Sequence, residues 1–244
     1  MRYGIFSDVH GNREALMAVL EALQTAGASR LINLGDTVGY GAEPDACVTI
    51  VREASDVAVI GNHDAAAVGR FDIEHANILA QQGIEYTIRQ LGAQNRRWLR
   101  ALPYSVREGD ACFCHGAPIN VETFEYVFSL DKAAMLTELH PRLAPITFVG
   151  HSHLTSTYVV TDRLTLQLDK SPRFCLRDSA KYVFNVGSVG QPRDRDARAC
   201  CVVWDTVERT VTFLRVPYDY QLAASKIFDA ALPSVFGLRL FQGM

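Results

Sequence analysis

The spacing of hydrophobic residues predicts alternating strands and helices in the first third of the chain. Three short apolar runs are typical of buried strands, at residues 2–6, 31–34 and 57–60. After the first run, one helix face with the spacing i, i+3, i+4, i+7 consists of Leu16, Val19, Leu20 and Leu23. Asn12 is placed to cap this helix and Gly27 to end it. With a second helix over 44–52, the β-α-β-α-β order indicates a parallel sheet.

The middle of the chain is predicted to be more helical, and strands dominate the last part. Helical patterns cover 73–90, 93–102, 131–139 and 218–231. Two further buried strands are predicted at 111–114 and 146–149. Closely spaced strands then follow at 155–160, 164–168, 182–186, 199–204 and 210–216. Their short connections predict an antiparallel meander.

The parallel and antiparallel parts together predict an α/β fold, a four-layer α/β/β/α sandwich of two facing mixed sheets. The chain has 244 residues, of which 48% are hydrophobic, enough to bury such a core without disulfides. No Ser/Gly-rich linker, Pro run or internal repeat divides the sequence. We therefore expect a single domain over residues 1–244, with helical, cap-like insertions at about 65–100 and 117–144.

Charge and targeting signals narrow the function classes. The formal net charge is −3, and the densest basic run, 95–100, suits the exposed face of a short helix, which argues against a nucleic-acid partner. No signal-peptide pattern and no run of about 20 apolar residues is present, so we expect a cytoplasmic protein without a membrane partner. The six cysteines form no paired CxxC motifs, which argues against a zinc ribbon and favours buried, reduced thiols.

Polar residues gather directly after five of the predicted strands, where ligands bind in open α/β sheets. The five segments are Asp8-Val9-His10, Gly35-Asp36, Gly61-Asn62-His63-Asp64, His115-Gly116 and Gly150-His151-Ser152-His153. Each segment alone is also compatible with an ordinary turn. All five in this order, each at a strand end, favour a functional site over chance.

These residue types together suit a site that holds two divalent metals. Two metals about 3.5–4 Å apart can lower the pKa of a bridging water and bind the oxygens of a phosphoryl group. The candidate ligands are two aspartates, one asparagine and four histidines, namely Asp8, Asp36, Asn62, His10, His115, His151 and His153. Such ligands suit Mn, Fe, Zn, Co or Ni better than Ca or Mg. His63 is left free to contact substrate.

The five segments resemble the calcineurin-like metallophosphoesterase superfamily, over residues 1 to about 217. The resemblance implies the same four-layer sandwich and two bound divalent metals, with Mn the expected choice in vitro. One metal would be bound by Asp8, His10 and His153, the other by Asn62, His115 and His151. Asp36 would bridge the two. His63 corresponds to a histidine that contacts the phosphate and can protonate the leaving oxygen.

Departures from the family pattern favour one branch. The protein Ser/Thr phosphatase branch has Asp-Arg where this chain has Gly39-Tyr40, and that aspartate pairs with the catalytic histidine. Here Asp64 or a backbone carbonyl would have to orient His63. The segments Gly39-Tyr40-Gly41 and Gly187-Ser188-Val189-Gly190-Gln191-Pro192-Arg193 resemble the small bacterial phosphodiesterase branch.

The expected activity is therefore phosphodiester hydrolysis by a metal-bridging hydroxide. Alternatives are a dinucleoside polyphosphate (Ap4A-type) hydrolase, or a phosphomonoesterase or protein phosphatase. A non-catalytic scaffold of the same fold is the least favoured alternative, because such a protein need not keep every ligand together with His63.

Three residues are candidates for contact with a small phosphorylated or nucleotide-like substrate. Asn12 is either a phosphate contact at a helix N-terminus or a plain helix cap. Arg193 can bind a phosphate with two hydrogen bonds or belong to a solvated charged loop, and Tyr40 can line the pocket or pack in the core. The apolar tail after Leu232 predicts packing on the chain's own core or, preferentially, a homodimer contact.

Overall fold

The computed structural model describes residues 1–73, 77–127, 129–168 and 171–244, and its strands form two six-stranded sheets. The first sheet has the order β3-β2-β1-β11-β12-β9. Its strands are β1 (Arg2–Phe6), β2 (Arg30–Asn33), β3 (Val57–Ala58), β9 (Arg173–Cys175), β11 (Ala199–Asp205) and β12 (Thr210–Val216). β1, β2 and β3 pair in parallel, which confirms the predicted β-α-β-α-β start.

The second sheet has the order β4-β5-β6-β10-β7-β8. Its strands are β4 (Ser105–Glu108), β5 (Ala111–Cys114), β6 (Ile146–Val149), β7 (Thr155–Val160), β8 (Thr165–Gln167) and β10 (Lys181–Val186). β10 pairs in parallel with β6 on one side and antiparallel with β7 on the other. Both sheets are thus mixed.

The predicted antiparallel meander is wrong. β10 inserts between β6 and β7, while β11 crosses to the first sheet and pairs antiparallel with β1. Every residue of β11 is buried. A strand buried on both faces carries no alternation in its sequence, so its pattern does not identify its sheet or its partners.

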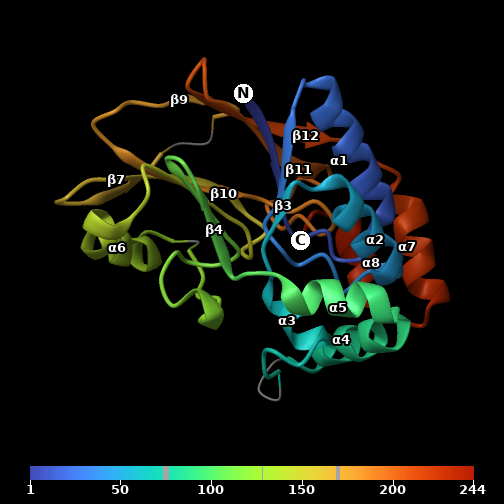
Figure 1. Cartoon of the computed structure of the whole chain (residues 1–244). Helices are drawn as coiled ribbons and strands as arrows, with labels where there is room; N and C mark the ends of the chain where they lie inside the picture. The colour runs from blue at the N-terminus through green and yellow to red at the C-terminus, as the bar shows by residue number, and fades with distance from the viewer. Residues whose placement is uncertain (74–76, 128, 169–170) are drawn as a thin grey trace.

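Four layers result from the way helices cover the outer faces of the two sheets (Figure 1). Between the sheets, a shared core contains Ile5, Phe113, Phe148, Phe184 and Trp204. α1 (Arg13–Thr25) and α2 (Pro44–Ala54) pack on the outer face of the first sheet. α6 (Leu130–Leu139) lies on the opposite outer face, over β7 and β8. The predicted α/β/β/α sandwich is confirmed.

Helix α1 illustrates how the apolar pattern positions the first strand-end loop. The side chain of Asn12 accepts a hydrogen bond from the backbone N–H of Ala15, and Gly27 ends the helix with a φ of +74°. Leu16, Val19 and Leu23 are fully buried against the first sheet. The sequence therefore fixes where the chain leaves β1, in the loop that carries Asp8 and His10.

Replacing Leu16 by Ala is expected to lower the free energy of unfolding by about 3 kcal/mol, because the cavity left in a fully buried site adds to the lost transfer free energy. Urea unfolding followed by circular dichroism measures the change. Met17→Ala is the matched control, because the Met17 side chain is 50% exposed and its loss should cost well under about 1 kcal/mol. Equal losses in both variants would contradict the packing described for α1.

Several elements differ from the prediction. The helix predicted over 73–90 is α4 (Ile78–Gln90), although residues 74–76 lie outside the described ones, and α5 spans Ala93–Ala101. The short α3 (Asn62–Ala67) begins within the third polar segment, where a strand end was expected. β4 and β9 were not predicted. Cys175, at the end of β9, is exposed, which corrects the prediction that the cysteines are buried.

The C-terminal tail forms a helix that packs partly on its own chain. α7 (Tyr220–Asp229) is followed by α8 (Ser234–Leu240), and Phe236 and Leu240 are buried between them and the loop that carries Tyr40. Leu238 and Phe241 remain exposed, at 56% and 46%. The expected homodimer contact through this tail therefore stays a prediction.

Candidate metal centre

The seven candidate ligands converge at one edge of the sandwich, because each follows the carboxyl end of a strand. Asp8 and His10 follow β1, Asp36 follows β2, Asn62 follows β3, His115 follows β5, and His151 and His153 follow β6. Apart from the half-buried Asn62, every one of these side chains is buried. The structure thus brings together all seven residues that the sequence singled out.

The first group of potential ligands consists of Asp8, His10 and His153. Nε2 of His10 and Nε2 of His153 face each other at 3.1 Å. Oδ1 of Asp8 lies 3.4 Å from Nε2 of His153 and 3.7 Å from Nε2 of His10. This carboxylate oxygen is buried and has no hydrogen-bond partner among the described residues.

The second group consists of Asp36, His115 and His151, with Asn62 beside them. Nε2 of His115 lies 3.2 Å from Oδ2 of Asp36 and 3.2 Å from Oδ1 of Asn62. Oδ2 of Asp36 is also 3.8 Å from Nε2 of His10, so this oxygen lies between the two groups. Oδ1 of Asp36 accepts a hydrogen bond from the backbone N–H of His63 at 2.8 Å, which fixes the orientation of the carboxylate.

Backbone carbonyl groups set the tautomers of three of these histidines. A carbonyl oxygen can only accept, so the ring nitrogen that faces it must carry the proton. The Nδ1–oxygen distances are 2.9 Å for His10 and Val38, 2.8 Å for His115 and Leu34, and 2.6 Å for His153 and Gln191. Whenever such a ring is neutral, the lone pair of its Nε2 is therefore directed into the cluster, the arrangement usual for metal-ligating histidines.

This donor set fits a divalent cation. The Nε2 lone pairs of His10 and His153 would repel each other at 3.1 Å, and the unpartnered Oδ1 of Asp8 adds a negative charge beside them. Buried acceptors that converge without donors are costly unless a cation or a proton compensates them. Imidazole and carboxylate donors in this number suit first-row transition metals.

The pKa values of the cluster indicate that a positive charge is favoured beside Asp36. Burial is the main cause that lowers the pKa of His151 and of His153 well below the ordinary value, so both rings are neutral. Burial also opposes a charge on His115, but the Asp36 carboxylate outweighs it and raises the pKa of His115 to about 9. Despite its burial, the pKa of Asp36 is held well below its usual range by His115 and His63. The site keeps Asp36 ionised and favours a cation beside it.

Strained backbone is concentrated at the candidate ligands. Left-handed φ angles occur at Asp8 (56°), His10 (49°), Asp36 (52°), His151 (67°) and His153 (58°). Residues other than glycine rarely adopt this conformation, which costs on the order of 1–3 kcal/mol each. Five residues in three strand-end loops therefore direct their side chains into one small volume at a cost to stability, as is common at functional sites.

His63 lies next to the cluster without being held by the carboxylate that the sequence suggested. The carboxylate of Asp64 accepts hydrogen bonds from the backbone N–H groups of Thr37, Val38 and Gly61. Nδ1 of His63 is buried without a hydrogen-bond partner among the described residues. Neither alternative, Asp64 or a carbonyl, therefore orients the ring by a hydrogen bond. Burial lowers the pKa of His63 to about 3, so the ring is neutral.

In place of a hydrogen bond, contacts with neighbouring rings and the close approach of Gly39 hold the His63 ring. The ring of His63 lies 4.6 Å from that of Tyr40 and 4.9 Å from that of His10, between ring centroids. Gly39 has a φ of +90°, and a Cβ at this position would lie 2.5 Å from Nδ1 of His63. The acidic side chain that protein phosphatases carry at this position has no room here unless His63 moves.

Gly39→Ala is expected to lower turnover of a phosphate ester roughly tenfold, because the new methyl group must displace the His63 ring. Steady-state kinetics at saturating metal measures the effect. Gly109→Ala is the matched control, since Gly109 also has a positive φ of +55° but nothing lies within 4 Å of its Cβ position. If both variants lose activity equally, backbone strain rather than displacement of His63 is responsible.

The candidate substrate contacts line the rim of the cluster. Both polar atoms of Asn12 are used within the protein, since Oδ1 accepts from Ala15 and Nδ2 donates to the carbonyl of Gly190 at 3.0 Å. Of the two roles considered for Asn12, this geometry matches the helix cap and not the phosphate contact. The ring of Tyr40 packs against His10 at 4.7 Å, and the guanidinium of Arg193 lies 5.6 Å from the centre of the Tyr40 ring. Tyr126, a residue of the predicted insertion, stacks on His151 at 3.8 Å.

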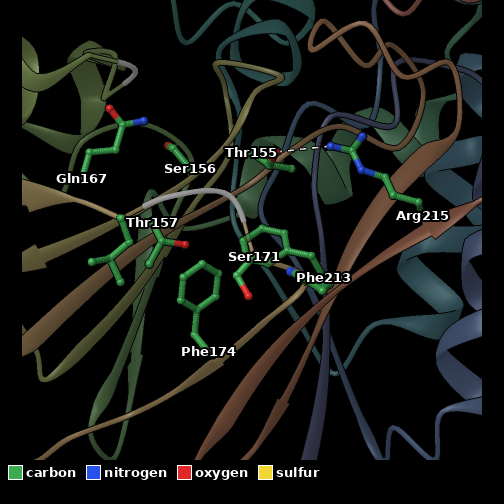
Figure 2. Close-up of a pocket in the computed structure, with 10 residues that line it drawn as sticks. Thr155, Ser156, Thr157, Gln167, Ser171, Phe174, Phe213 and Arg215 are labelled. Atoms are coloured by element: carbon green, nitrogen blue, oxygen red, sulfur yellow. Dashed lines mark hydrogen bonds between the residues drawn. The ribbon is translucent and has the colours of Figure 1, made fainter.

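A separate cavity of about 260 Å³ lies between the edges of the two sheets (Figure 2). Its lining combines hydroxyl groups with apolar side chains, including Thr155, Thr157, Phe174 and Phe213. At one end Arg215 bonds to Thr155 and is paired with Asp194. Among the described residues that line this cavity, none is a histidine or a carboxylate, whereas the strand-end cluster brings together both kinds of metal ligand.

Two facing mixed sheets with buried Asp and His clusters at their strand ends define a metallophosphoesterase fold and site. Residues 1–209 match the calcineurin-like phosphoesterase superfamily domain, and the chain belongs to this superfamily. It is 34% identical over 245 residues to an uncharacterized protein of Methanocaldococcus jannaschii, covering 98% of this chain and 97% of that protein.

Solved structures agree with this assignment. A metallophosphoesterase from Sphaerobacter thermophilus is 34% identical, with a TM-score of 0.85 over 100% of this chain and 99% of that one. A hypothetical protein from Pyrococcus horikoshii OT3 has a TM-score of 0.79 at 18% identity, over 100% of this chain and 98% of that one, and shows the shared fold. Among the residues described here, no helix has the length and apolar character needed to cross a membrane.

Proposed function

We propose that this protein is a phosphodiesterase that works with two divalent metal ions. The observation that carries the proposal is the pair of buried Asp/His groups that meet at Asp36. In this proposal, one cation would be held by Asp8, His10 and His153, and the second by Asn62, His115 and His151. Asp36 would contribute a ligand to both. Mn is the expected ion in vitro, and Fe, Zn, Ni and Co suit the same donors.

When bound, the two cations supply Lewis-acid stabilisation of phosphoryl oxygens and lower the pKa of a water molecule. The protein orients the side chains that would bind the cations. The carbonyl groups of Val38, Leu34 and Gln191 hold three imidazoles with Nε2 free, and the N–H of His63 holds Asp36. The His63 ring lies beside the cluster, where its protonated form could donate a proton to the leaving oxygen; with a pKa lowered to about 3 by burial, the ring is neutral until substrate binds. A phosphate bound next to this ring would raise its pKa and favour the protonated form.

A small diester substrate is favoured over a phosphoprotein by the loop that carries Gly39 and Tyr40. The Tyr40 ring lies where the phosphatase branch has arginine, and Gly39 contacts His63 where that branch has aspartate. The carboxylate that would hold His63 in its protonated form is therefore replaced by close packing. The alternative within the enzyme class, a dinucleoside polyphosphate hydrolase, uses the same cluster and differs in the groups that contact the rest of the substrate.

Activity after metal removal and replacement tests the proposal. Protein treated with a chelator and reloaded with Mn²⁺ would be assayed on bis-p-nitrophenyl phosphate, p-nitrophenyl phosphate and diadenosine tetraphosphate. We expect hydrolysis that depends on metal and is fastest for the diester. A preference for diadenosine tetraphosphate would favour the anhydride hydrolase. Two bound metals without turnover of any of the three compounds would contradict the proposed activity.

A further inference from the structure

The C-terminal helix α8 lies against the loops of the metal centre. The ring of Phe236 packs on the ring of Tyr40 at 4.9 Å, and Leu240 lines a small cavity together with His10 and Gln191. Beyond the helix, the carbonyl of Gly243 accepts a hydrogen bond from the backbone N–H of Arg195. Phe236, Leu240 and Gly243 lie outside residues 1–209, the part of the chain that matches the superfamily domain.

This packing brings Arg239 to the same rim as Arg193. Arg239 follows Phe236 by three positions and therefore shares its face of the helix, toward Tyr40. Arg193 lies over the Tyr40 ring, and its backbone N–H donates to the carbonyl of His153. Burial lowers the pKa of Arg239, and the positive charge of Arg193 lowers it further.

Neither arginine has an acidic partner. Across the described parts of the chain, no carboxylate lies within 4.0 Å of Arg193 or Arg239. Arg193 donates to Oε1 of Gln191 at 2.8 Å, and its Nε is buried without a partner.

The carboxylates of the same loop are engaged elsewhere, because Asp194 pairs with Arg215 and Asp196 pairs with Arg198. Two half-buried positive charges close to each other are unfavourable unless an anion is bound between them.

We propose that Arg193 and Arg239 bind a second phosphate group of the substrate, one that is not cleaved. This inference rests on the proposed phosphoesterase function and specifies its substrate class. Tyr40 contacts the rings of His10 and His63 as well as Phe236, so it lies between the metal ligands and α8. The Tyr40 side chain therefore separates the arginines from the proposed metal positions, so they lie further from the metals than the scissile phosphate would. A phosphodiester that carries a second, uncleaved phosphate group fits this arrangement.

Binding of two inorganic anions tests the inference without relying on turnover. Metal-loaded protein, desalted to remove free metal, would be titrated calorimetrically with orthophosphate and with the non-hydrolysable imidodiphosphate. We expect Arg239→Gln and Arg193→Gln to weaken imidodiphosphate binding roughly tenfold and to change orthophosphate binding less than about twofold. Arg239→Lys should retain part of the affinity, because it keeps the charge but loses the planar fork.

Controls separate this role from general effects. Arg163→Gln, in the exposed turn between β7 and β8, removes the same charge and should leave both affinities unchanged. Melting temperatures and metal content identify any variant that fails to fold or to load. Equal weakening of both anions, or no weakening of either, would overturn the inference. If imidodiphosphate binding depends on the arginines while no ester is hydrolysed, the proposed activity fails and the binding site stands.

Discussion

Asp36→Asn is expected to lower metal-dependent hydrolysis by about 10³-fold or more. Asparagine keeps the shape of the side chain and can still accept the N–H of His63 through its oxygen, so the local fold should persist. The substitution removes the negative charge of the carboxylate, whose Oδ2 lies 3.2 Å from Nε2 of His115 and 3.8 Å from Nε2 of His10. Since this oxygen lies close to a histidine of each group, its loss is expected to weaken both metal positions at once.

Turnover and metal content measured on the same sample check this expectation. Elemental analysis of Mn-loaded protein should give two metals per chain for the wild type and fewer for the variant. Asp162→Asn, an exposed residue in the turn after β7, is the matched control and should behave as the wild type. An Asp36→Asn variant that keeps two metals and full activity would remove Asp36 from the proposed bridging position.

His63→Ala is expected to lower kcat by about 10²- to 10³-fold while both metals remain bound, because His63 belongs to neither full ligand set in the proposed assignment. The physical reason is the loss of a proton donor at the leaving oxygen. The loss should therefore be larger for an ester with a basic alkoxide leaving group than for bis-p-nitrophenyl phosphate, whose leaving group needs little protonation.

Comparison of the two leaving groups distinguishes the roles of His63. A loss that is equal for both esters would indicate that the ring positions the substrate instead of donating a proton. A loss of metal in the variant would place His63 among the ligands, which is sterically possible because it lies within reach of His10 and Asp36. Full turnover with two metals bound would contradict both roles.

The sequence predicted the candidate site more completely than the fold around it. Ligand types and their positions after apolar runs are local properties, and parallel strands bring such positions to one edge of a sheet. Asp8, His10 and Asp36 could therefore be selected before any geometry was known. The hydrogen-bond partners of those ligands could not be selected from the sequence. They are the backbone carbonyl groups of Val38 and Gln191, whose direction depends on tertiary packing.

Strand pairing in the second half was beyond the reach of the sequence pattern for a related reason. β10 and β11 follow each other along the chain, yet they belong to different sheets. Burial on both faces, as in β11, leaves no polar face to show the direction of the core. The choice of partner is made by the packing of Phe184, Val202 and Trp204 between the sheets.

By itself the sequence determined the class of fold, the ends of most strands and the residue types able to bind metals, because these follow from spacing and composition along a few residues. Only the tertiary structure decided how the rings of His63 and Tyr40 pack, that Asp64 binds backbone N–H groups, and that α8 packs on Tyr40 through Phe236. Those arrangements depend on contacts between segments as far apart as α8 and the loop after β2. Local hydrophobic patterns do not encode such long-range contacts, since these arise only when the whole core is packed.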